Sequence, residues 1–215
     1  IYAQRVTPDG MVLWSANGVI ISTGSDNKTL PGILSDGSGF DIIVWQDFRW
    51  GEGDIYAQRI NTAGSVNWTA NGVAICTAGG EQSWYRMISD GLGGAIIAWQ
   101  DYRNGNWDIY AQRVSYNGTL NWPTYGVPIC TDSGNQTVPW VQRDDTGGAI
   151  IGWQDGRSGN SDIYAQRVTA GGTVLWTANG VPVCTASGDQ ALPRAMPDGL
   201  DGVIIAWQDY RSGNW

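Results

Sequence analysis

The chain has 215 residues, a formal net charge of −8 and no histidine. This composition argues against binding to nucleic acid or an anionic membrane surface, which need a basic face, and it excludes His-based triads and imidazole metal ligands. The 31 glycines and 13 tryptophans instead indicate many tight turns between strands that pack large aromatic side chains.

The chain is built from a repeat of 54 residues. The sequence IYAQR occurs four times, beginning at Ile1, Ile55, Ile109 and Ile163. A fixed period of this length is typical of repeat folds, in which each unit buries its apolar face against the next. A WQDxR signature keeps the same step, and its residues are Trp45, Asp47, Arg49, Trp99, Asp101, Arg103, Trp153, Asp155, Arg157, Trp207, Asp209 and Arg211.

One unit, taken in chain order, contains several short β-type segments. Residues 93–101 (GGAIIAWQD) form a β-rich run, and residues 108–114 (DIYAQRV) alternate, so that successive side chains face opposite ways. Residues 119–122 (TLNW) follow a YNG turn, and 126–130 and 138–148 add further β-type segments. No window has a helical period. We therefore predict about four short antiparallel strands per unit.

Four strands in about 50 residues make one blade of a β-propeller. The chain begins at IYAQR and ends in WQDYRSGNW, so the last two strands of one blade are expected at the N-terminus and its first two at the C-terminus. Pairing of these strands would close a four-bladed ring, and the same halves fit an eight-bladed ring of two chains or a piece of a longer array. We predict an all-β chain with a single β-propeller domain over residues 1–215.

The repeat also resembles a known type of sequence. The pattern DGxGGxIIAWQDxRxGNxDIYAQRVxxxGxxxWxxxGVxICTxxGxQ is similar to repeats of large secreted bacterial proteins that are read as β-propellers. The resemblance covers the whole chain. It implies an extracellular propeller, and we know of no catalytic role tied to such repeats.

The WQDxR signature occurs in every unit, whereas a catalytic site normally occurs once per ring. We therefore expect a structural role, in which the Asp accepts turn amides or pairs with the Arg and the Trp packs between blades. Cys76, Cys130 and Cys184 also share one repeat position, with Ser22 at the fourth, and are expected to be buried free thiols.

One loop suggests an alternative based on metal binding. Asp101, Asn106 and Asp108 cluster oxygen ligands of the kind that calcium prefers, and the cluster recurs with Asn160 and Asp162. The spacing lacks the dense pattern of a calcium loop, and a hairpin held by Asn and Asp side chains explains it equally. We expect no cofactor and leave calcium as the alternative.

Binding is better supported than catalysis, because extra aromatic residues occupy loop positions that vary between units. Exposed Trp and Tyr beside Asp, Asn and Arg suit sugar recognition by stacking and hydrogen bonding, although the same rings can fill gaps between blades. Trp84, Tyr85 and Trp140 are further extra aromatics. The candidate ligand-binding residues are Trp50, Tyr102, Trp107, Tyr210 and Trp215.

A glycosidase would need a pair of carboxylates that breaks the repeat. The residues that qualify are scattered over variable loops without an obvious pair: Asp26, Asp41, Glu52, Glu81, Asp132, Asp189 and Asp201. Of the arginines, Arg86, Arg143 and Arg194 alone lie outside the two sets that follow the repeat.

The sequence therefore favours a non-catalytic extracellular β-propeller that acts as a structural or protein-interaction module. A lectin-like propeller is the alternative, and a glycoside hydrolase is less well supported. The expected partners are other protein domains or carbohydrate, with a homodimer as a further option, and neither nucleic acid nor a membrane.

Overall fold

The structure is a computed structural model that describes residues 1–214, which form an all-β arrangement with no helix among them. Each unit contributes four strands that pair in antiparallel fashion. The first strands are β3 (Lys28–Ser35), β7 (Gln82–Ser89), β11 (Gln136–Arg143) and β15 (Gln190–Pro197). The second strands are β4 (Phe40–Asp47), β8 (Ala95–Asp101), β12 (Ala149–Asp155) and β16 (Val203–Asp209). The third strands are β1 (Tyr2–Ala3), β5 (Asp54–Asn61), β9 (Asp108–Val114) and β13 (Asp162–Val168), and the fourth are β2 (Val19–Ile20), β6 (Val73–Cys76), β10 (Val127–Cys130) and β14 (Val181–Cys184).

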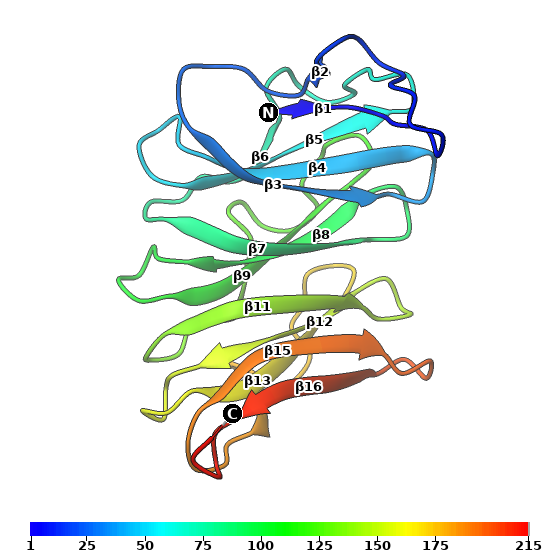
Figure 1. Cartoon of the computed structure of the whole chain (residues 1–215). Coiled ribbons are helices and arrows are strands. Elements are labelled where there is room, and N and C mark those ends of the chain that lie inside the picture. The colour runs from blue at the N-terminus through cyan, green and yellow to red at the C-terminus, as the bar shows by residue number, and fades with distance from the viewer. Residues whose placement is uncertain (215) are drawn as a thin grey trace.

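These strands form three complete blades and two half-blades. The complete sheets are β3-β4-β5-β6, β7-β8-β9-β10 and β11-β12-β13-β14, and the half-blades are β1-β2 and β15-β16. Each chain end therefore carries two strands of a unit, and a blade shared between the two ends stays a prediction. The halves lie at opposite ends of the stack and belong to separate sheets (Figure 1), so this chain does not close a four-bladed ring on itself. The two-chain ring and the longer array stay predictions.

One predicted strand is wrong. Residues 119–122 follow a turn and form no regular strand: they pair with the end of β9 through an isolated bridge between Val114 and Leu120, beside which the Asn121 N–H donates to the Arg113 carbonyl at 2.8 Å. The side chain of Gln112 holds the next residues: its Oε1 accepts the Trp122 N–H at 3.0 Å, and its Nε2 donates to the Pro123 carbonyl at 2.9 Å. The pairing therefore continues through a side chain of the third strand where a strand would continue it through backbone.

Both faces of the middle strands are buried, because each complete sheet packs between two neighbours. All seven residues of β8 are buried, and Trp45, Trp99 and Trp153 have no exposed surface. In the DIYAQRV segments, successive side chains therefore point alternately to the two neighbouring blades. They do not alternate between the core and the solvent. In β16, beyond which no further blade lies, burial alternates between partial and exposed.

The first strands form one continuous face, which is called the first-strand face below. β7 contacts β11, and β11 contacts β15; this face is turned to the viewer in Figure 1. Each first strand carries a β-bulge with a shift in register, at which one residue takes a left-handed conformation with φ of 50–52°. The four bulge residues are Leu30, Trp84, Val138 and Leu192. A bulky residue at positive φ is unusual, so the surrounding sheet must impose this conformation.

Candidate functional site

The signature residues form a closed polar network inside each blade. The Asp101 carboxylate accepts the Trp99 Nε1–H at 2.8 Å, and Arg103 donates to it from Nε at 2.8 Å and from Nη2 at 2.6 Å. The Arg103 guanidinium lies over the Tyr110 ring, 3.8 Å from its centre. Asp101 itself is fully buried. Its carboxylate is neutralised within the blade, so it has no free lone pair aimed at a ligand.

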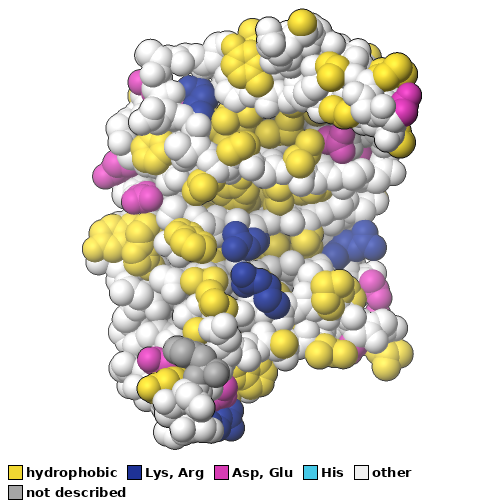
Figure 2. Space-filling view, in the orientation of Figure 1, with side chains coloured by type: hydrophobic (Ala, Val, Ile, Leu, Met, Phe, Trp, Pro, Cys, Tyr) yellow, Lys and Arg dark blue, Asp and Glu magenta, His cyan; other side chains and the backbone are white. Residues whose placement is uncertain are grey.

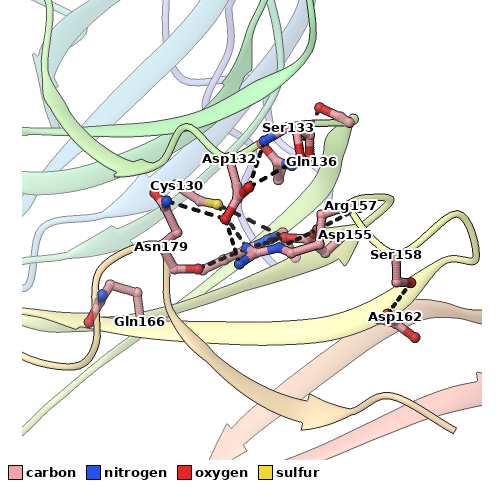
Figure 3. A network of polar contacts seen from close by, with 12 residues as sticks. Cys130, Asp132, Ser133, Gln136, Asp155, Arg157, Ser158, Asp162, Gln166 and Asn179 are labelled. Atoms are coloured by element: carbon pink, nitrogen blue, oxygen red, sulfur yellow. Dashed lines mark hydrogen bonds and ion pairs between the residues drawn. The ribbon is translucent and has the colours of Figure 1, made fainter.

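The same arginine also joins neighbouring blades, as Figure 3 shows for the third blade. Arg157 donates from Nη2 to Cys130 Sγ at 3.1 Å and to the Asn179 carbonyl at 2.9 Å, and from Nη1 to Asp132 at 3.0 Å. Cys130 ends β10, the last strand of the preceding blade, and Asp132 follows it. The signature therefore contributes to the packing of successive blades as well as to the turn within one blade.

The three cysteines are free, as expected for thiols at equivalent positions of different blades. Cys76 and Cys130 are buried, and Cys184 is partly exposed. Burial raises the pKa of Cys76 and of Cys130 to about 12, so both thiols stay protonated at neutral pH.

The loop proposed as an alternative calcium site is organised as a hydrogen-bonded hairpin. Asn104 and Asn106 each donate from Nδ2 to the Asp108 carboxylate, at 2.7 and 3.0 Å. Asn106 Nδ2 also donates to the Gly134 carbonyl at 2.7 Å. Asp101, the remaining residue of the cluster, is engaged by Arg103. Amide N–H groups therefore surround Asp108 where a cation would need oxygen atoms, so this arrangement does not fit calcium.

Three of the predicted ligand-binding aromatics lie on hairpins between second and third strands, Trp50 in the first blade and Tyr102 with Trp107 in the second. The Trp50 side chain is 76% exposed, and its Nε1 donates to the Tyr56 hydroxyl at 3.3 Å. Tyr102 and Trp107 contact each other, with ring centres 5.0 Å apart. Tyr210 follows β16 and is exposed, and Trp215 lies outside the described residues. Tyr102 and Trp107 therefore form an aromatic pair on the hairpin of the second blade.

A pocket of about 470 Å³ opens between β3 and β7 on the first-strand face. Tyr85 stands where the other units have proline, and its hydroxyl donates to the Leu30 carbonyl and to the Val44 carbonyl. This ring bridges the two blades and forms part of the pocket wall. The lining residues are Leu30, Pro31, Gly32, Trp84, Tyr85, Arg86 and Met87.

The charge of the first-strand face is opposite to that of the chain. The four first strands contain Lys28, Arg86, Arg143 and Arg194 but no Asp or Glu. Within residues 1–214, the three arginines form no ion pair with a carboxylate. Burial, and then the nearby charge of Arg194, lower the pKa of Arg86. Figure 2 shows two basic side chains close together in the middle of this face, among apolar ones.

The carboxylates considered for a glycosidase do not converge. Asp132 binds Arg157, and Asp189 accepts the Ser161 N–H at 2.9 Å on the next hairpin. Glu52 and Asp201 each line a pocket, but the two pockets lie on different blades and share no residue.

Comparison with known proteins supports the fold. No protein-family profile matches the chain, and no curated protein matches its sequence. The endo-arabinase from Bacteroides thetaiotaomicron VPI-5482 has a similar structure, with a TM-score of 0.52 and 16% identity over 93% of this chain and 75% of that one. A thermostable family-43 glycoside hydrolase has a TM-score of 0.47 and 13% identity over 86% of this chain. The chain spans 66% of that second protein. At 16% identity the likeness to the endo-arabinase shows the β-propeller fold alone.

Sequence reasoning noted the residues of the β3–β7 pocket without choosing them as a site. Trp84 and Tyr85 were recognised as extra aromatics, and Arg86 as an arginine outside the repeat. The signal that could have combined them is their position: all three are consecutive in one first strand, at positions that vary between units. Their grouping with Leu30 and Gly32 of the neighbouring blade depends on how the blades pack.

Proposed function

We propose that this chain is a non-catalytic extracellular β-propeller that serves as an interaction module and binds its partner through the first-strand face. The observation that carries the proposal is the basic character of this face in an acidic chain. Arg86, Arg143 and Arg194 break the repeat, all three lie on first strands, and none is paired with a carboxylate of residues 1–214. Unpaired arginines favour a partner that supplies carboxylate, sulfate or phosphate groups.

The distribution of acidic residues supports a binding role over a catalytic one. Glycoside hydrolysis requires two carboxylates that flank the scissile bond. The first strands offer none, and the signature aspartates are held by their own arginines. The likeness to an endo-arabinase is a likeness of fold, and the proposal does not extend that activity to this chain.

The pocket between β3 and β7 favours carbohydrate as a second candidate ligand. Trp84 is 52% exposed at the bulge and lines the pocket beside Arg86. An exposed indole can stack on a sugar ring while a guanidinium donates to its hydroxyl or carboxylate groups. This candidate uses the same face as the interaction module and differs only in the partner.

The extracellular location is part of the proposal and rests on the resemblance of the repeats to those of secreted proteins. In the described residues no helix is long and apolar enough to cross a membrane.

A binding screen tests the proposal. The purified chain is offered to arrays of acidic and neutral glycans and to acidic protein domains, at low and high salt. We expect binding that weakens as salt rises and that falls about tenfold or more in Arg86→Gln/Arg194→Gln. Tyr116→Ala, which alters an exposed aromatic in the turn after β9, is the matched control and should bind normally.

The variants also separate the two candidates. Loss of glycan binding in Trp84→Ala, with retained binding of acidic protein, would assign the pocket to carbohydrate. Unchanged binding in Arg86→Gln/Arg194→Gln would contradict the proposal. Hydrolysis of an offered glycan by the folded chain would contradict it as well.

A further inference from the structure

The hairpins between second and third strands end in an aspartate that needs hydrogen-bond partners. In the second blade, Asn104 and Asn106 both donate to Asp108. In the third blade, Ser158 Oγ donates to Asp162 at 2.6 Å. Both aspartates are almost fully buried, so these donors offset the cost of removing a carboxylate from water.

The first blade lacks these donors. Trp50 and Glu52 occupy the positions of Asn104 and Asn106, and the equivalent aspartate is Asp54. Asp54 is only 4% exposed, and its Oδ2 has no hydrogen-bond partner. A buried carboxylate oxygen without a donor is costly, and so it needs an explanation in terms of what it binds.

The backbone of the hairpin is the same in both cases. The Gly53 carbonyl accepts the Gln82 N–H at 2.6 Å, and the Trp107 carbonyl accepts the Gln136 N–H at the same distance. The difference between the blades therefore lies in the side chains, and the first blade has lost donors without any change of loop shape.

Asp54 lines a pocket of about 370 Å³ at the junction of the first two blades, and the exposed Trp50 ring lines it too. Glu52 is held beside it, since its Oε2 accepts the Gly80 N–H at 2.7 Å. The lining residues are Trp50, Glu52, Asp54, Thr77, Ala78 and Gly79.

The side chains around this pocket carry more negative than positive charge. Asp47 and Glu52 are the negative neighbours of Asp54, and Arg49 is the positive one. The Arg49 guanidinium is already engaged by Asp47, to which it donates from Nε at 2.9 Å and from Nη2 at 2.6 Å. Burial, followed by the charge of Asp47, raises the pKa of Asp54 to about 6.

We propose that this pocket binds an organic cation, the ammonium group of a lysine side chain on a partner protein. Asp54 and Glu52 accept its N–H groups, and the exposed Trp50 ring offers a cation–π face. The site is separate from the first-strand face, so the proposal does not depend on the function proposed above. A calcium ion fits the pocket less well, because calcium needs six or more oxygen ligands and an exposed indole supplies none.

The test is a titration of the full chain with Nα-acetyl-lysine methylamide, followed by the backbone amide NMR signals of Thr77, Ala78 and Gly79, which line the pocket and are present in every variant. The Nε-acetylated form of the same compound has no charge and serves as the ligand control. Calcium chloride is the third ligand. We expect saturable shifts with the charged compound and none with the neutral one or with calcium.

Three variants make the test independent of folding. Asp54→Asn should weaken binding about tenfold or more. Trp50→Asn/Glu52→Asn installs the amide pair of the second blade, so it should keep the fold and lose the ligand. Asp108→Asn removes an equivalent carboxylate that is already satisfied, and binding should be unchanged.

The proposal would be overturned by equal shifts with the charged and neutral compounds, by calcium binding that Asp54→Asn abolishes, or by unaltered lysine binding in the double variant. An absence of any saturable shift in the wild-type chain would overturn it as well.

Discussion

Trp99 packs against Gly126 so closely that no side chain fits at the glycine. A Cβ at Gly126 would lie 2.7 Å from the end of the Trp99 ring and 2.8 Å from the Ala111 carbonyl oxygen. The glycine also has φ of +92°, which other residues adopt only with strain. The same Trp–Gly contact recurs at Gly72 and Gly180. This pair explains why both residues keep the 54-residue step.

A substitution at this contact should destabilise the fold strongly. We expect Gly126→Ala to lower the free energy of unfolding by about 2–4 kcal/mol, because it adds a steric clash with backbone to an unfavourable φ. Denaturant unfolding measures the change. Gly105→Ala, at a glycine with positive φ but open space around it, is the control and should cost less.

The unpartnered Asp54 makes stability depend on pH. Its folded pKa of about 6 exceeds the ordinary 3.8, so the folded state binds a proton more readily than the unfolded state. The free energy of unfolding should therefore fall as pH rises from about 4 to about 6, by on the order of 1–2 kcal/mol, and stay lower above pH 6.

Asp54→Asn should remove this decline and stabilise the protein at pH 7. Thermal unfolding at a series of pH values compares the variant with the wild type. A decline of equal size in both proteins would show that another group is responsible.

At the scale of elements, the bulge in each first strand determines which side chains reach the first-strand face. The bulge shifts the register between first and second strands and turns Leu30, Trp84 and Leu192 outward, where each is exposed. The sequence alone shows apolar residues in a β-type run, which predicts burial. In the structure these bulge residues are exposed instead, because the left-handed backbone at the bulge interrupts the regular alternation of the strand.

Tyr85 of β7 connects its blade to the preceding one, since its hydroxyl donates to backbone carbonyls of β3 and β4. We expect Tyr85→Phe to lower the free energy of unfolding by about 1–2 kcal/mol, because the Leu30 and Val44 carbonyls lose a donor. Chemical denaturation measures this. Tyr116→Phe, which alters an exposed tyrosine, should have no effect, and a loss of equal size there would contradict the interpretation.

For the whole molecule, the two half-blades differ from the complete blades in what their signature residues contact. Trp207 is partly exposed, whereas Trp45, Trp99 and Trp153 are fully buried. Gly18, the equivalent of Gly126, faces Ala3 and Tyr2 rather than a tryptophan ring. Packing is therefore strongest in the middle of the stack and weakest at its ends.

This gradient predicts the order in which the thiols react. Cys184 is partly exposed and lies next to the β15-β16 half-blade, whereas Cys76 and Cys130 are buried with raised pKa values. Cys184 should be alkylated first, and the other two only as the blades open. Mass spectrometry of partly labelled protein measures the order, with denatured chain as the control. Equal rates in the native chain would contradict the gradient.

The sequence by itself determined the repeat, the all-β class and the strand content of a blade. These follow from local chemistry: periodic Gly and Trp, turn residues and β-branched runs act over a few residues and recur every 54. The predicted strand at 119–122 was wrong because its backbone pairing stops after one bridge, and the side chain of Gln112 binds the residues that follow.

Only the tertiary structure decided which residues meet. The Trp84–Arg86 pocket needs Leu30 from the neighbouring blade, and the isolation of Asp54 is visible only when its hairpin is compared with those that hold Asp108 and Asp162. Such groupings depend on the packing between blades and on hydrogen bonds between side chains. No local sequence pattern predicts them, because the partners of each residue lie in another repeat or in another loop.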